Sequence, residues 1–272
     1  MDFLVNTLGY VLNFLYKLVQ NYGLAIILFS ILFKLLMLPI SIKQQKTMKK
    51  TAKIQAELKK IQEKYKNNPE KMNTETINLY KRENMSPFGG CLSGIIQIIV
   101  LFAVFYLVRS PLTYMKKVEP SLIEQYTNEV KQISDENNMY PEIAIINEKG
   151  ADDERVYINM EFLGLDLSSI PNQNLTDWRV YVIPGLYVVT SFISMRLTNN
   201  MQTVKKDENE EPSEMEAVMQ ANKSMTYIMP IMSISISIIA PLGLALYWLV
   251  NNLLMIGERL ILNKFLKEEE EN

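Results

Sequence analysis

The sequence predicts an all-α integral membrane protein with five transmembrane helices, an N-terminal interfacial helix and a cytoplasmic helical hairpin. Three observations lead to this fold class: long segments with almost no charge, loops of opposite net charge between them, and a basic amphipathic stretch after the first segment. The averages conceal this pattern, because the mean hydropathy is +0.01 and the formal net charge is -2 over 272 residues.

Composition excludes most enzyme chemistry. The chain has no histidine and a single cysteine, Cys91, so histidine-based nucleophilic catalysis, an intrachain disulfide and a CxxC site are all excluded. Neither GxxxxGK[ST] nor GxGxxG occurs, so nothing in the sequence indicates nucleotide binding. We therefore expect a protein that is not an enzyme and has no cofactor or metal site.

The apolar segments are long enough to cross a bilayer, which needs about 20 residues per helix. The last two are short, but Pro241 separates them and they are interpreted as a helical pair joined by a tight turn. A soluble protein has too little polar sequence to cover all of these helices. The five expected spans are 22–42, 91–109, 178–196, 225–240 and 242–264.

The first residues, 1–21, are apolar but carry a polar stripe at helical spacing. This pattern favours an external helix that lies in the membrane interface over a sixth span or an uncleaved signal sequence. A signal peptide would begin with a basic stretch and end at a cleavage site of small residues, and residues 1–21 have neither feature. The stripe consists of Asp2, Asn6, Gly9, Asn13, Lys17 and Gln20.

The loops predict the orientation, because basic residues near spans remain in the cytoplasm. Residues 43–82 hold eleven Lys and one Arg against four acids, whereas 110–177 holds five basic and thirteen acidic residues. The expected cytoplasmic parts are thus a hairpin at 43–86, a loop at 197–224 and a tail at 265–272. The N-terminus and the loop 110–177 are expected outside, with a small hairpin around Glu148-Lys149-Gly150.

The basic stretch predicts two antiparallel amphipathic helices. In the first, Ile54, Leu58, Ile61 and Tyr65 recur at helical spacing, and Asn68-Pro69 is typical of the start of the second. Anionic lipid is the simplest partner of the lysines. Aromatic residues are too sparse among them for sequence-specific nucleic-acid binding. The lysines expected to make contacts are Lys49, Lys50, Lys53, Lys59 and Lys60.

Lys34 is the candidate functional residue, because a charge inside a span is costly. No Asp or Glu falls within the apolar parts of the expected spans, which are 22–42, 91–108, 178–195, 225–240 and 242–257. Lys34 could snorkel toward the interface, or it could face a water-containing cavity that attracts negative charge. Polar, methionine and aromatic residues could line such a cavity, although Ser and Thr more often pack or bond to their own helix. The candidate lining residues are Gln97, Ser191, Ser194, Met229, Ser233 and Trp248, with Thr190, Ser235 and Ser237 as further polar positions.

Taken in order, seven short segments resemble the YidC membrane insertase family over almost the whole chain. One of them is the pair Leu38-Pro39, which follows a basic residue, Lys34. The other six are 21–27, 43–45, 66–72, 89–92, 229–232 and 241–248.

The resemblance implies a protein of the bacterial cell (plasma) membrane that inserts nascent membrane proteins, alone or beside the Sec translocon, and helps them fold. It implies five spans around a hydrophilic groove open to cytoplasm and lipid, with Lys34 as its positive charge. The hairpin would receive the nascent segment, and the tail would help to contact the ribosome.

Three departures from the family pattern stand out. Lys34 replaces the usual arginine, which keeps the charge but loses the planar fork. Ser93 replaces the usual proline after Gly-Gly-Cys-Leu. The acylated N-terminal cysteine common among Gram-positive members is absent, as is an obvious signal peptide. The alternative function is a small anion transporter or channel with Lys34 as its anion site, but no inverted repeat supports it.

Overall fold

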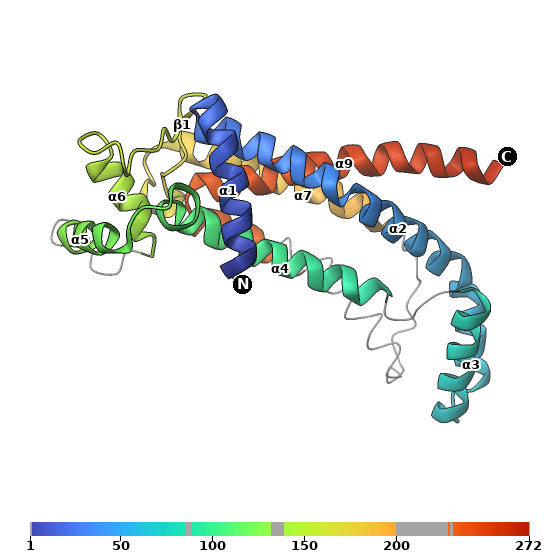
Figure 1. Ribbon diagram of the computed structural model, residues 1–272. Helices are drawn as coiled ribbons and strands as arrows, with labels where there is room; N and C mark the ends of the chain where they lie inside the picture. Colours follow the sequence, from blue (N-terminus) through green and yellow to red (C-terminus); the bar gives the residue numbers. More distant parts are fainter. Residues whose placement is uncertain (1, 85–88, 132–138, 200–227, 229–230, 272) are drawn as a thin grey trace. The chain divides into compact units, whose positions relative to one another are not determined.

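The computed structural model describes residues 2–84, 89–131, 139–199, 228 and 231–271, and they are mainly helical (Figure 1). Three helices in these ranges are long and apolar enough to cross a membrane: Tyr22–Thr47, Trp178–Leu197 and Leu242–Asn263. The chain is therefore a membrane-integral, all-α protein in its overall class. The expected loop 197–224 and the first part of the expected span 225–240 lie mostly outside the described residues, but residues 231–239 are helical.

The structure divides into two compact units. The first contains Met1–Leu35, Ile99–Thr190 and Ser233–Leu254, and the second contains Leu36–Ile98, Ser191–Met232 and Met255–Asn272. The long helices α2 (Tyr22–Lys64), α4 (Gly89–Arg109), α7 (Val182–Asn199) and α9 (Leu242–Glu271) each contribute residues to both.

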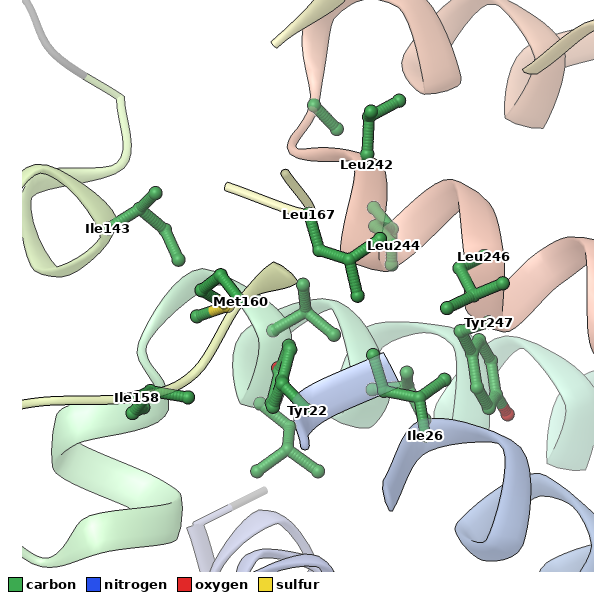
Figure 2. Close-up of a cluster of buried hydrophobic side chains, with 14 of the residues drawn as sticks. Tyr22, Ile26, Ile143, Ile158, Met160, Leu167, Leu242, Leu244, Leu246 and Tyr247 are labelled. Atoms are coloured by element: carbon green, nitrogen blue, oxygen red, sulfur yellow. The ribbon is translucent and has the colours of Figure 1, made fainter. Parts of the chain in front are cut away.

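The core of the first unit forms where α2 and α9 begin (Figure 2). Tyr22, Leu167 and Leu242 are each at most 1% exposed. Main-chain hydrogen bonds reinforce this packing, because the segment 159–169 accepts bonds from the first residues of both helices. Tyr22 N donates to Asn159 O at 3.0 Å, and Leu242 N donates to Ser169 O at 2.9 Å. We call the segment 159–169 the clamp.

The N-terminal helix α1 (Asp2–Val19) packs against the short π-helix η1 (Leu112–Lys116). The buried face of α1 contains Val5, Leu8, Gly9, Leu12 and Tyr16. A Cβ atom on Gly9 would lie 2.0 Å from the carbonyl oxygen of Tyr114, so only glycine allows this approach. The exposed face of α1 is largely apolar and includes Phe3, Tyr10, Phe14 and Leu18.

The segment 110–177 corrects one expectation. The residues around Glu148-Lys149-Gly150 form no β-hairpin, because Pro141 starts the helix α6 (Pro141–Lys149) and Gly150 caps its end by donating to Ile146 O. The β-hairpin lies further along the chain, where β1 (Glu161–Phe162) pairs with β2 (Leu165–Asp166). The helix α5 (Pro120–Lys131) packs on α6 (Figure 1).

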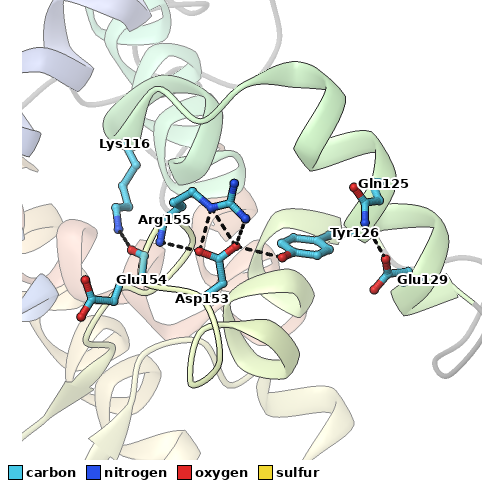
Figure 3. A network of polar contacts seen from close by, with 7 residues as sticks. All are labelled: Lys116, Gln125, Tyr126, Glu129, Asp153, Glu154 and Arg155. Carbon is cyan, nitrogen blue, oxygen red and sulfur yellow. Dashed lines mark hydrogen bonds and ion pairs between the residues drawn. The ribbon is translucent and has the colours of Figure 1, made fainter.

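Polar contacts join α5 to the loop that follows α6 (Figure 3). Asp153 accepts hydrogen bonds from Arg155 and from the Tyr126 hydroxyl at 2.8 Å, and Arg155 holds the pKa of Asp153 below its ordinary value. The Lys116 ammonium group donates to the carbonyls of Glu154 and Tyr157, while partial burial lowers its pKa. These contacts fix the loop that leads into the clamp.

A buried carboxylate holds η1 in place. Glu142, in the first turn of α6, is 5% exposed and accepts hydrogen bonds from the amides of Leu112 and Thr113 at 2.7 and 3.0 Å. The Thr113 hydroxyl donates to its other oxygen at 2.6 Å. A side chain of one helix thus caps the N-terminal amides of another.

Replacing Glu142 with alanine is expected to lower the free energy of unfolding by about 1–3 kcal/mol, because the buried amide of Leu112 and the partly buried amide of Thr113 lose their acceptor. Glu142→Gln keeps an acceptor oxygen and should cost less. Burial raises the pKa of Glu142, so the folded state takes up a proton at higher pH than the unfolded chain. The wild type should therefore gain stability relative to Glu142→Gln as pH falls through that raised pKa, as measured by thermal unfolding in detergent. If the difference in unfolding stability between the wild type and Glu142→Gln does not change with pH, the prediction is wrong.

In the second unit, α2 and α3 (Pro69–Arg82) form the expected antiparallel pair. Asn68 caps α3 by accepting a hydrogen bond from Lys71 N at 3.1 Å, as the Asn-Pro sequence predicts. A small apolar cluster joins the two helices, and Arg82 forms an ion pair with Glu57 at its edge. The cluster consists of Ile54, Leu58, Leu79 and Tyr80, with Ile61 packed against it.

Leu58→Ala is expected to increase amide hydrogen exchange throughout α3, because Leu58 is 2% exposed and such truncations cost about 2–5 kcal/mol. Arg82→Ala should change the exchange little, since an exposed ion pair contributes only about 0–1 kcal/mol. Equal effects of the two substitutions would mean that the cluster does not hold the pair together.

Two helices are longer than expected. The first arm of the hairpin is not a separate helix, because α2 runs without a break from Tyr22 to Lys64 and includes Pro39. Pro39 removes one hydrogen bond, to the Leu35 carbonyl, but the lysine-rich residues that follow favour helix. Near the C-terminus, α9 continues to Glu271 through the expected tail, since no Gly or Pro follows Gly257.

Candidate functional site around Lys34

Lys34 lies on the less exposed side of α2. Its side chain is half-buried, and Ser30, one turn earlier on the same face, is fully buried. Leu35 and Leu36, which point to the other side, are each 62% exposed. Exposed leucines in a candidate span are suited to contact with lipid, whereas Lys34 lies on the less exposed side.

Several polar side chains form hydrogen bonds within their own helices. The Ser30 hydroxyl donates to Ile26 O at 2.8 Å. Thr190 and Ser237 also bond to carbonyls of their own helices, at Leu186 and Ile234, as is usual for such residues. These hydroxyls are therefore satisfied by their own helices.

Trp248 is 6% exposed and packs on Tyr187, with ring centroids 5.7 Å apart. Phe29 packs on Tyr247 in the same unit, with centroids 6.5 Å apart. Ser233 is 5% exposed. Trp248 and Ser233 are thus buried in the first unit, which also contains Lys34.

A second basic residue in a span was missed by the sequence reasoning. Arg259 of α9 donates from Nη1 to the carbonyl oxygen of Ser194 on α7 at 3.1 Å, within the second unit. Ser194 and Ser191 are 5% and 2% exposed. The available signal was a single arginine within the expected span 242–264, which sequence alone does not distinguish from a residue at the end of the span.

The second unit also joins α2 to α9 through a polar pair. Gln45, which is 4% exposed, donates from Nε2 to Asn263 Oδ1 at 3.1 Å. This hydrogen bond favours one register of the two helices, because a shift would leave the buried Gln45 amide without its acceptor.

The candidate residues are divided between the two units. Lys34, Ser233 and Trp248 belong to the first, and Ser191 and Ser194 belong to the second. Met229 and the side chain of Gln97 lie outside the described residues.

The hairpin lysines belong to the second unit. Lys50 and Lys60 are exposed, Lys49 and Lys59 are half-buried, and the side chain of Lys53 lies outside the described residues. In the part of the chain that the structure describes, no group of three or more Cys, Asp and Glu side chains is arranged to hold a metal ion.

A family model described as "60Kd inner membrane protein" matches residues 14–270. Three relatives are each named membrane protein insertase YidC. That of Chloroherpeton thalassium is 32% identical over 95% of this chain, and that of Chlorobaculum tepidum is 30% identical over 96%. That of Fusobacterium nucleatum is 28% identical over 94%.

The chain spans 36% of the length of the first two relatives and 93% of the Fusobacterium protein. A family match over nearly the whole chain agrees with the apolar helices and with the basic hairpin described above. The chain belongs to the YidC family of 60Kd inner membrane proteins.

Proposed function

We propose that this protein is a membrane protein insertase and chaperone that moves nascent membrane proteins from the cytoplasm into the bilayer. The observation that carries the proposal is the half-buried Lys34 on the less exposed face of a candidate span, in a chain whose relatives are named insertases. The proposed path is a groove open to cytoplasm and lipid, with Lys34 as its positive charge.

The physical problem is the transfer of a polar segment across the hydrocarbon core, where unsatisfied polar groups cost several kcal/mol each. A water-containing groove shortens the low-dielectric distance that the segment must cross. Lys34 would attract a passing carboxylate, and burial of the substrate's apolar span in lipid would supply the driving force without a nucleotide. The proposed lining residues are Gln97, Ser191, Ser194, Met229, Ser233 and Trp248.

The remaining parts of the proposal concern orientation and partners. We infer five spans in a bacterial plasma membrane, with the N-terminus outside, α1 in the interface and the C-terminus in the cytoplasm. The positive net charge of residues 43–82 supports this orientation. The hairpin would meet the nascent chain and anionic lipids, and the ribosome and the Sec translocon are proposed as further partners.

Reconstitution in liposomes tests the function directly. A ribosome-synthesised single-span substrate with a short acidic outer segment should become protease-protected in liposomes that contain the protein, and not in empty ones. A chloride flux through the same liposomes without insertion would support an anion channel and would contradict the proposal.

Photo-crosslinking tests the path. Leu36 and Met37 are adjacent on α2 and lie about 100° apart around the helix axis, with Met37 on the side of Lys34 one turn earlier. Only Leu36 is exposed. A photoreactive side chain at position 37 should crosslink the polar segment of a stalled nascent chain, and one at position 36 should crosslink mainly lipid. The same products from both positions would contradict a groove on the Lys34 side.

A further inference from the structure

The turn of the β-hairpin has an unusual residue at its tip. Leu163 and Gly164 join β1 to β2 with φ values of 52° and 75°. Asn, Asp and Gly suit this left-handed conformation, whereas it is sterically unfavourable for leucine. Leu163 is also 87% exposed, so a large apolar side chain lacks protein contacts as well as being in a strained conformation. A residue with both disadvantages indicates a use that offsets them.

The clamp holds this tip next to the start of two spans. The Asn21 side chain donates to Glu161 O at 2.7 Å, one residue before Tyr22, where the candidate span Tyr22–Thr47 begins. Phe162 lies directly on the first turn of α2, because a Cβ atom on Gly23 would be 2.4 Å from its ring. Gly243 N, at the start of α9, donates to Leu167 O at 2.9 Å.

The residues at which spans begin lie at the boundary between headgroups and hydrocarbon. Trp178, which begins the second candidate span, belongs to the same unit and is 73% exposed, as is typical of tryptophan at a membrane surface. The hairpin is therefore fixed at the level of the bilayer surface and continuous with the lipid-facing start of α2.

The two strands also limit how deeply the β-hairpin can enter the bilayer. Glu161 and Asp166 lie opposite each other in the register, and both are exposed. Their carboxylates remain in water or among headgroups, because a charge in hydrocarbon is costly. Only the two-residue turn can enter the apolar region.

We propose that the Leu163-Gly164 turn is a shallow lipid anchor, in which the leucine side chain is inserted at the acyl-chain boundary of the bilayer surface where α2 begins. The anchor holds the clamp against the membrane. It does not depend on the proposed insertase activity, because it concerns only the protein and lipid.

The test uses the full chain with Cys91→Ser, reconstituted in liposomes and spin-labelled at Leu163→Cys. The matched control is Ala151→Cys, an exposed position after α6 next to Asp152 and Asp153. The measured quantity is the ratio of the spin label's collision rate with oxygen to its collision rate with a water-soluble nickel complex. This ratio should be roughly fivefold or more higher at position 163 than at position 151, since the nickel complex is excluded from hydrocarbon.

A second pair of variants tests the leucine itself. A label at Gly164→Cys, within the turn, should lose much of its protection from nickel when Leu163→Asn is added, because asparagine fits the left-handed turn but does not insert in lipid. A Cβ atom at position 164 would meet nothing within 4 Å, so the label itself has room. Equal ratios at 163 and 151 would overturn the proposal. A label at 163 that is immobilised and accessible to neither reagent would also overturn it, since the tip would then contact protein.

Discussion

Lys34→Glu is expected to abolish insertion of substrates with acidic outer segments, while Lys34→Arg retains it and Lys34→Met lowers it. At a separation of ~6 Å and an effective dielectric constant of about 20, one lysine–carboxylate attraction is worth about 3 kcal/mol. Loss of that attraction corresponds to roughly a hundredfold change in rate, and charge reversal adds repulsion. Complementation of an insertase-depleted strain and protease protection in liposomes both measure the effect.

The matched control is Lys43→Glu. Lys43 is exposed and lies on the opposite face of the same helix, nine residues after Lys34. A substrate whose outer segment is neutral serves as the second control, because its insertion should depend much less on the charge at position 34. If Lys34→Glu inserts acidic substrates as well as wild type does, the electrostatic role is wrong.

Gly9→Ala is expected to destabilise the protein by about 1–3 kcal/mol and to release α1 from η1. The new methyl group would meet the main chain of Tyr114, with 2.0 Å to its oxygen and 2.7 Å to its carbonyl carbon, and the main chain cannot rotate away as a side chain can. Gly9→Val should have a larger effect. Thermal unfolding in detergent and protease cleavage of α1 provide the measurements.

Gly185→Ala is the control for Gly9→Ala. Gly185 lies in the helix α7, and a Cβ atom there would meet nothing within 4 Å. Alanine in an open helical position is expected to stabilise by about 0.5–1 kcal/mol. A loss at Gly185 as large as the loss at Gly9 would contradict the proposal that the close approach of α1 to Tyr114 decides the outcome.

Local sequence signals predicted several elements well. Asn68-Pro69 predicted the start of α3, and the spacing of Ile54, Leu58 and Ile61 predicted the face that packs on it. The segments 22–42, 178–196 and 242–264 correspond to the three helices that can span a membrane. Each of these signals depends on residues that are close together in the sequence, so each can be recognised from the sequence alone.

Features that depend on distant residues were not predictable in this way. Gly9 belongs to a polar stripe in the sequence, yet it is buried because η1 approaches it from more than 100 positions along the chain. The Leu163-Gly164 turn lacks the usual Asn-Gly signal, since its conformation is imposed by the clamp. Arg259 and Ser194 are partners only because two helices pack together.

The clamp bears on the protein's own biogenesis. It bonds to Tyr22 and to Leu242, so the first span cannot be locked in place until the start of the last one has been synthesised. At about 5–20 residues per second, the ribosome takes roughly 10–40 s to make the intervening chain. During that time the first residues of α2 lack part of the core that holds them, and α9 completes this core once it has been synthesised.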